Sequence, residues 1–341
     1  MIDLKKRAYP LSEGFANYLA SFARAATLPV SYGDLLRYSG AVALYDKNGD
    51  DTLWSTLSYP PSDRRELMSG LVQTYAILRS GGDRSVMAHL EVDRVDLCLY
   101  GNSQPFRVRI INTLNENFDY FYVKRADASR VYGLELEQVL SPNDLTFYVD
   151  QATLIEEHIF GIPGDLFIAK YMDANLNEVR LAKEFVKFNE RCFLRLLGDM
   201  HSSNFVVDVV MDFEENSYRI RPIDFDQQSY EPRRLVYLPQ YYKENNPIIQ
   251  LGMKHLTSAS VEQYQLEERT LIRKRMRSSD FRLEALLCCM ERDELAPAEN
   301  VAALGAELAD FHRSPEFSRC QTMGALVRAS LAPLRKGGPA A

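Results

Sequence analysis

The sequence of 341 residues lacks several features that would place a protein in a class at once. No apolar run approaches the roughly 20 residues that a transmembrane helix requires, and no apolar core of a secretory signal follows the charged N-terminus. The five cysteines form no Cys-x-x-Cys pair, and the histidines show no spacing typical of zinc ligands. With a net charge of −7, the chain also lacks the excess of Lys and Arg usual in nucleic-acid-binding proteins. These absences favour a cytoplasmic protein, with no membrane and no nucleic acid among its partners.

Two common enzyme motifs are also absent. The sequence contains no Gly-x-Ser-x-Gly elbow of a hydrolase and no Gly-x-Gly-x-x-Gly loop of a dehydrogenase. What is present is the composition of an ordinary globular protein, with 46% hydrophobic and 26% charged residues. The length allows one large or two modest domains.

Changes of periodicity divide the chain into three parts. Residues 1–84 are predicted to be an N-terminal helical extension, because apolar residues recur at helical spacing between Leu11 and Arg79. Within this part, Asp46–Thr52 carries oxygen-bearing side chains at alternate positions, as a calcium loop does. The sixth position is Asp51 rather than the glycine that such a loop requires, so a solvated Asn48-Gly49 turn is favoured.

Residues 85–159 are predicted to form a small lobe of antiparallel sheet with one helix. Three alternating strands lead up to Lys124, a helix follows at roughly 128–140, and two further strands complete the segment. Residues 160–341 are predicted to form a mainly helical large lobe, interrupted by two strands at 205–210 and 218–223. A strongly amphipathic helix from Leu181 to Leu197 leads into the most informative stretch of the chain.

That stretch is Leu197-Gly198-Asp199-Met200-His201-Ser202-Ser203-Asn204, and Ile223-Asp224-Phe225-Asp226 follows the next predicted hairpin. Asp199 and Asn204 lie between a helix and a strand, where both side chains can face one cavity, and Asp224 supplies a second carboxylate. Phosphoryl transfer needs such oxygen-bearing groups, one to orient the proton of the nucleophile and two to hold Mg²⁺ on the phosphates.

The two motifs together resemble the catalytic and metal-binding loops of the protein-kinase-like superfamily, especially its branch of aminoglycoside phosphotransferases and choline kinases. Those enzymes carry His-Gly-Asp-Leu-His-x-x-Asn-like loops followed by Ile-Asp-Phe/Trp-Asp/Glu. This chain departs from the pattern at Leu197, where the family usually has a histidine that braces the loop. The resemblance covers roughly Ser85 to Asp226. It implies an α+β, bilobal, kinase-like fold, preceded here by the helical extension.

The resemblance also implies a role for each matching residue of the two motifs. Asp199 is the expected catalytic base, and Asn204 and Asp224 are the expected Mg²⁺ ligands. Asp226 is expected either to be a further ligand or to hold the loop. His201 is expected to brace the loop through a hydrogen bond.

For the nucleotide, the resemblance implies residues in the small lobe. Lys124 is expected to bind the phosphates of ATP while a helix glutamate holds it in place, and Glu135 is preferred over Glu137 for that partner. Backbone groups in the segment that contains Glu157 and Ile159 are expected to bind the adenine.

The implied function is ATP- and Mg²⁺-dependent transfer of the γ-phosphate to a hydroxyl group. A small-molecule acceptor is favoured, because the segment after Asp226 contains no Asp-Phe-Gly and leads to no Ala-Pro-Glu-like anchor for a peptide-binding loop. Two alternatives remain open. A catalytically inactive module that acts through a protein partner is supported by Leu197 and by Tyr100–Ser103, a candidate phosphate loop with only one glycine. Transfer of AMP instead of phosphate would use the same metal and lysine.

Overall fold

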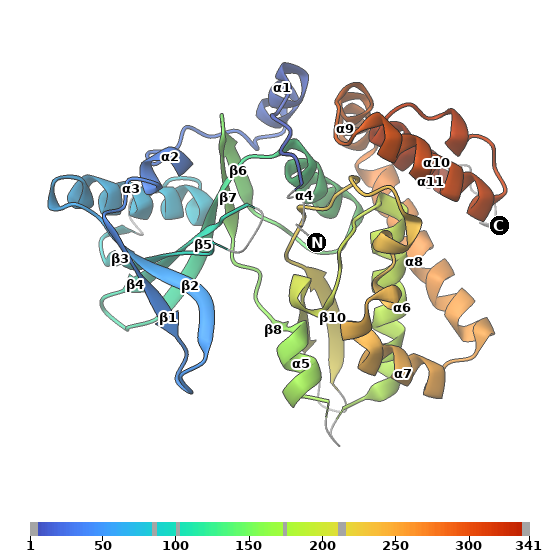
Figure 1. The fold of residues 1–341 in the computed structure, drawn as a ribbon, viewed down its shortest axis with the longest axis horizontal. Helices are drawn as coiled ribbons and strands as arrows, with labels where there is room; N and C mark the ends of the chain where they lie inside the picture. The colour runs from blue at the N-terminus through green and yellow to red at the C-terminus, as the bar shows by residue number, and fades with distance from the viewer. Residues whose placement is uncertain (1–5, 84–86, 100–102, 173–175, 211–215, 336–341) are drawn as a thin grey trace. The chain divides into compact units, whose positions relative to one another are not determined.

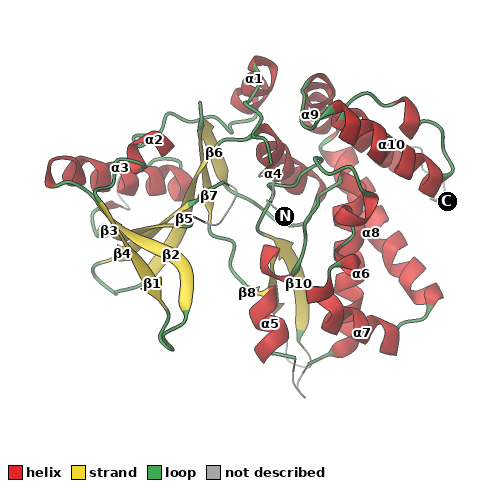
Figure 2. Cartoon of the chain, viewed as in Figure 1, coloured by secondary structure: helices red, strands yellow, loops and turns green. Residues whose placement is uncertain are grey.

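The computed structural model describes residues 6–83, 87–99, 103–172, 176–210 and 216–335 of the chain (Figure 1). The chain forms two compact units. The first comprises Met1–Asp127 with Leu145–His158, and the second comprises Ala128–Asp144 with Ile159–Ala341. Antiparallel sheet and helices occur in both units (Figure 2), which confirms the predicted α+β class. In the part of the chain described, no helix is long and apolar enough to cross a membrane.

A seven-stranded sheet is the centre of the first unit, with the strand order β1-β2-β3-β4-β5-β7-β6. As predicted, β3, β4 and β5 form an antiparallel meander, and β7 pairs with β5 after an intervening helix. The strands are β1 Gly40–Tyr45, β2 Asp51–Ser58, β3 Leu90–Leu97, β4 Phe106–Asn112, β5 Phe118–Arg125, β6 Phe147–Asp150 and β7 Thr153–Glu157; the helices are α1 Glu13–Ser21, α2 Tyr32–Leu35 and α3 Pro61–Ser80.

The two faces of this sheet differ in chemistry, because successive side chains of a strand point to opposite faces. Val95, Val108 and Phe121 lie on one face, are almost completely buried, and belong to an apolar cluster that includes Leu67 and Leu71 of α3. Burial of this face against α3 supplies the hydrophobic free energy that holds the unit together.

The opposite face of the sheet is polar. Arg107 of β4 donates a hydrogen bond to the buried carboxylate of Asp96 on β3 at 2.8 Å. Tyr122 of β5 lies directly opposite Arg107 on one side and Glu156 of β7 on the other. Lys124 follows Tyr122 by two positions, so its side chain projects from this polar face.

The prediction of a mainly helical N-terminal segment is wrong for two of its elements. Helices α1, α2 and α3 do occur there, but β1 and β2 lie between α2 and α3, and β2 pairs with β3 to extend the sheet. Most residues of β1 are exposed, so the strand lacks the apolar and polar alternation that identifies a half-buried strand. The predicted Asn48-Gly49 turn is confirmed, with a φ of 88° at Gly49, and it joins these two strands.

The second unit is mainly helical, with a short sheet in the order β10-β9-β8. Helix α4, Ala128–Leu140, lies where the sequence predicted a helix, but it groups with this unit and not with the large sheet. The predicted hairpin is present as β9 Phe205–Val210 and β10 Ser217–Pro222, while residues 211–215 lie outside the described part. The other elements are β8 Ile162–Pro163, α5 Gly164–Lys170, α6 Glu178–Arg195, α7 Asn246–His255, α8 Ser258–Ser278, α9 Asp280–Arg292, α10 Ala298–His312 and α11 Met323–Arg335.

A buried ion pair joins α4 to the end of α6, the helix that leads to Asp199. The Arg195 guanidinium pairs with the Glu137 carboxylate, and the two side chains are only 2% and 1% exposed. Glu137 also accepts hydrogen bonds from Ser141 Oγ and Asn143 Nδ2, at 2.6 and 2.8 Å. These bonds satisfy the oxygens of the buried carboxylate, and the pair fixes the last turn of α6.

Removal of one member of this pair is expected to destabilise the second unit. Arg195→Met leaves the Glu137 carboxylate buried without its cation, at a cost of about 3–5 kcal/mol in the free energy of unfolding. Urea unfolding followed by circular dichroism measures the loss. The control is Lys254→Met, which removes one member of the exposed pair with Glu178 and should leave the urea midpoint nearly unchanged. Equal losses in the two variants would contradict the assigned importance of the buried pair.

Candidate functional site

The loop that carries Asp199 begins where α6 ends. Leu196 terminates the helix in the left-handed conformation, with a φ of 56°, and Asp199 is also left-handed, with a φ of 61°. Residues other than glycine rarely adopt positive φ, so the surrounding contacts must hold the loop in this shape. Asp199 N–H donates to Val236 O at 3.2 Å, and the Asp199 carbonyl accepts a hydrogen bond from Asn204 Nδ2 at 2.7 Å.

Asn204 links the Asp199 loop to the second motif. Its side-chain amide lies 3.4 Å from Asp199 Oδ2, and its backbone carbonyl accepts a hydrogen bond from Ile223 N–H at 3.0 Å. His201 Nδ1 accepts a hydrogen bond from Ser203 N–H, and His201 Nε2 lies 4.0 Å from the Asp199 carboxylate. Asp199, Asn204 and the segment that begins at Ile223 are therefore brought together, and His201 makes the kind of loop contact predicted for it.

Arg130 of α4 is a residue of this site that the sequence interpretation missed. Its guanidinium is 1% exposed, lies 3.3 Å from the Asp224 carboxylate and forms a second ion pair with Asp226. The Asp224 side chain is 36% exposed and that of Asp226 only 11%, so Asp224 is the more accessible to a metal ion. This geometry favours the second predicted role of Asp226, that of holding the loop. An arginine within a predicted apolar helix was the available signal, because such a residue is rarely buried unless paired.

The Asp199 carboxyl group is placed in an electronegative environment. Burial, the largest cause, and the nearby carboxylates of Asp224, Glu231 and Asp226 together raise the pKa of Asp199 to about 6, against an opposite effect of His201. A carboxylate whose pKa lies near neutrality is better suited to accept a proton than an ordinary aspartate. The same repulsion would be relieved by a cation bound among these groups.

Asn204 and Asp224 fit a magnesium ion by the chemistry of their donors. Mg²⁺ takes hard oxygen ligands and keeps several waters, so one carboxylate and one amide oxygen suffice from the protein. Among the residues that the structure describes, no group of three or more His, Cys, Asp or Glu side chains is arranged to hold a metal ion. Any Mg²⁺ held by Asn204 and Asp224 would keep waters as its other ligands.

Gln228 braces the loop in place of the histidine that the resemblance led one to expect at Leu197. Leu197 is fully buried, and its backbone forms a bridge with Gln228. The Gln228 side-chain amide donates to the carbonyls of Arg195 and Leu196, at 2.5 and 3.2 Å. A brace that reaches the loop from the segment after the second motif leaves no local sequence pattern, which explains why it was not predicted.

In the first unit, Lys124 has a partner other than the predicted one. Its ammonium group forms a buried ion pair with Glu156 of the neighbouring strand β7, at 2.7 Å. Glu135, the predicted partner, lies on α4 in the second unit and forms an ion pair with Arg282 of α9. Glu137, the other candidate, is likewise paired within the second unit. A helix glutamate was predicted because the resemblance implies one. The partner Glu156 depends on the pairing of β5 with β7, which the sequence pattern does not show.

The predicted adenine-binding segment spans the passage from the first unit to the second, between His158 and Ile159. The Glu157 N–H donates to Thr146 O at 3.0 Å, so this amide is occupied within the sheet and is not available to adenine. Ile159 is half-buried and lies outside any strand, and its role stays a prediction. Of the predicted phosphate loop, residues 100–102 lie outside the described part of the chain.

Comparison with known proteins gives little beyond these observations. No family model matches the sequence, and no curated protein matches it. Among solved structures, the chain is similar to titin kinase with its flanking domains, at 12% identity and a TM-score of 0.24, over 69% of this chain and 45% of that one. It is also similar to the autoinhibited serine kinase domain of titin, at 12% identity and a TM-score of 0.25, over 66% of this chain and 88% of that one. At this sequence identity and TM-score, neither structure assigns a function to this chain.

Loss of the Gln228 brace is expected to loosen the Asp199 loop. Gln228→Ala leaves the buried carbonyl of Arg195 without its amide donor, while the Leu196 carbonyl keeps its bond from Ser229 N–H, and the free energy of unfolding should fall by about 1–3 kcal/mol. Hydrogen–deuterium exchange at the amides of Gly198 and Asp199, both bonded in the native loop, should become faster. Gln240→Ala, at an exposed side chain, is the control. Unchanged exchange in Gln228→Ala would refute the bracing role.

Proposed function

We propose that this chain is an ATP- and Mg²⁺-dependent phosphotransferase that moves the γ-phosphate to a hydroxyl group of a small-molecule acceptor. The observation that carries the proposal is the environment of Asp199. Burial and neighbouring carboxylates raise the pKa of its carboxyl group to about 6, and its backbone is held in the left-handed conformation. The carboxyl group contacts the side-chain amide of Asn204, and the Asp224 carboxylate of the same site is accessible. A proton acceptor beside two oxygen donors for magnesium is the arrangement that phosphoryl transfer uses.

Each residue has one task in this proposal. Asp199 accepts a hydrogen bond from the acceptor hydroxyl and orients its oxygen for in-line attack on the γ-phosphorus. Asn204 and Asp224 would supply oxygen ligands for Mg²⁺, and the ion would contribute neutralisation of charge on the phosphates when bound. Lys124 keeps the role that the resemblance implies, binding of the α- and β-phosphates, and Glu156 holds its ammonium group within the first unit. Most of the rate gain comes from positioning and charge neutralisation, because the transition state is loose and needs little base strength.

Arg130 favours a second candidate function, a catalytically inactive module that acts through a protein partner. Its guanidinium already compensates part of the negative charge of Asp224 and Asp226, which a metal ion would otherwise neutralise. Such a module would retain the loop geometry without turnover. A third outcome, transfer of AMP, is recognised by the mass added to the protein or to an acceptor.

The first test is thermal unfolding of the full chain with ATP, with and without Mg²⁺. At a ligand concentration 100-fold above Kd, binding to the native state alone stabilises it by about 2.7 kcal/mol, a rise of a few degrees in Tm. We expect this rise in the wild type and in Asp199→Asn, which keeps the ligands, and its loss in Asp224→Asn. Asp208→Asn, a matched change on β9 outside the motifs, should behave as the wild type.

Turnover separates the remaining possibilities. ATP consumption, or a phosphoryl group added to protein or acceptor, should be seen with the wild type and be absent in Asp199→Asn. Mg²⁺-dependent binding without turnover for any acceptor would favour the inactive module, and addition of AMP would favour nucleotidyl transfer. No rise in Tm with ATP and Mg²⁺ would overturn the proposal.

The two acidic residues of the second motif should separate by experiment. Asp226→Asn removes the partner of a buried guanidinium and is expected to lower the free energy of unfolding by about 3 kcal/mol, while the Mg²⁺-dependent rise in Tm with ATP persists. Asp224→Asn is expected to abolish that rise at a smaller cost in stability, since Asp224 is more exposed. If Asp226→Asn abolished the rise without loss of stability, Asp226 would be a metal ligand instead.

A further inference from the structure

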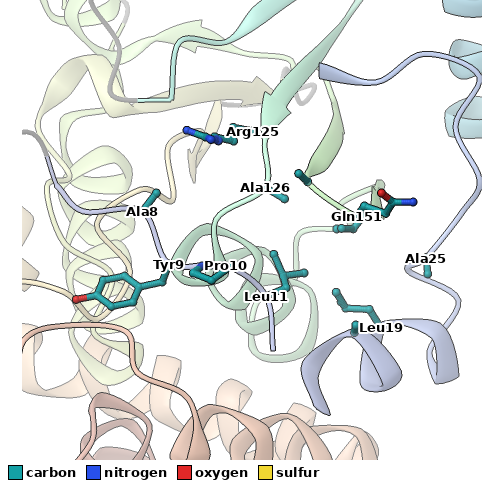
Figure 3. Close-up of a pocket in the computed structure, with 12 residues that line it drawn as sticks. Ala8, Tyr9, Pro10, Leu11, Leu19, Ala25, Arg125, Ala126 and Gln151 are labelled. Carbon is teal, nitrogen blue, oxygen red and sulfur yellow. The ribbon is translucent and has the colours of Figure 1, made fainter. Parts of the chain in front are cut away.

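The first unit contains a pocket that the proposed phosphotransfer does not use. Its volume is about 560 Å³, within the range of about 300–1,000 Å³ typical of small-molecule sites. Figure 3 shows Arg125 and Ala126 of the β5 end, Gln151 of the β6–β7 turn, and Leu11 and Leu19 from the N-terminal region around this space. All twelve lining residues belong to the first unit.

The lining is apolar apart from a few groups. Alanine, leucine, valine and proline side chains make up most of the wall, and Arg125 is its one charged residue. The acidic residues that flank the pocket in sequence are already engaged. Asp127 pairs with Lys6 at 3.0 Å and accepts a hydrogen bond from Tyr9 N–H, while Asp150 accepts one from Leu28 N–H.

The exposed side chain of Arg125 brings a positive charge to this apolar pocket. No residue in the described part of the chain forms an ion pair with its guanidinium. Gln151 also lines the pocket, with an exposed side chain whose amide points away from Arg125 (Figure 3), so Arg125 is the residue that can hold an anionic group. A planar guanidinium presents parallel N–H donors that match the two oxygens of a carboxylate.

The pocket is separate from the lysine of the proposed reaction. Arg125 follows Lys124 on β5, and successive side chains of a strand point to opposite faces of a sheet. Lys124 projects from the polar face with Tyr122, so Arg125 projects from the other. A ligand bound at Arg125 would leave the Lys124–Glu156 pair in place.

We propose that this pocket binds a small amphipathic carboxylate, with its carboxylate on the Arg125 guanidinium and its aliphatic chain against the apolar wall. The apolar wall accounts for the aliphatic chain, and Arg125, the one charged residue of the lining, accounts for the carboxylate. The site is independent of the phosphotransfer proposed for Asp199.

The test is isothermal titration of the full chain with hexanoate, octanoate and decanoate, with octanamide as the uncharged analogue. Affinity should rise by up to about fourfold per methylene while the chain still fits. Octanoate should bind at least about tenfold more tightly than octanamide, because only the carboxylate forms a charge-assisted pair. Arg125→Gln should remove that difference, while Arg65→Gln, the same change of charge on the exposed surface of α3, should preserve it.

A filled pocket gives the second arm of the test. Ala16→Trp places an indole ring at a lining position on the exposed side of α1 and should abolish octanoate binding, whereas Ala20→Trp, on the same helix but outside the lining, should not. Circular dichroism establishes that each variant is folded. Equal binding of octanoate and octanamide, binding unaffected by Ala16→Trp, or no binding would overturn the proposal. Tighter binding of octyl phosphate than of octanoate would overturn the carboxylate assignment in favour of a phosphate monoester.

Discussion

Helix α4 buries charged side chains that must find partners, and much of the second unit depends on that requirement. Arg130 and Glu137 lie about two turns apart on the same side of the helix. They reach the Asp224–Asp226 segment and Arg195 of α6 respectively, while Glu135, on another side, reaches Arg282 of α9. A buried charge without a partner costs several kcal/mol, so each pair is satisfied only in one arrangement of these elements. Both motifs of the site are therefore positioned from a single helix.

This arrangement explains how an electronegative site can be stable. Burial and, after it, the nearby carboxylates of Asp224, Glu231 and Asp226 raise the pKa of Asp199. The buried Arg130 guanidinium offsets part of the repulsion, because it forms ion pairs with Asp226 and with one oxygen of Asp224. The repulsion between the accessible part of the Asp224 carboxylate and the Asp199 carboxyl group remains. A cation or a proton bound among these carboxylates would relieve their repulsion.

The sequence predicted elements that follow from local patterns, but it did not predict contacts between residues far apart in the chain. The bounds of α4, the meander up to Lys124 and the hairpin after Asn204 follow from periodicity and were predicted. Strand β1 was missed because its side chains are mostly exposed. The partners of Lys124 and of the loop, Glu156 and Gln228, depend on which backbones lie side by side, and neither periodicity nor motif spacing contains that information.

The path of the chain between the two units bears on how the protein forms during synthesis. The chain leaves the first unit after Asp127, passes through α4, and returns at Leu145 to add β6 and β7. Until those residues emerge from the ribosome, β5 has no neighbour on one side, and its row of backbone donors and acceptors is open to any other strand. A nascent chain that has exposed β5 but not yet β6 and β7 therefore presents an open strand edge to which another chain can pair.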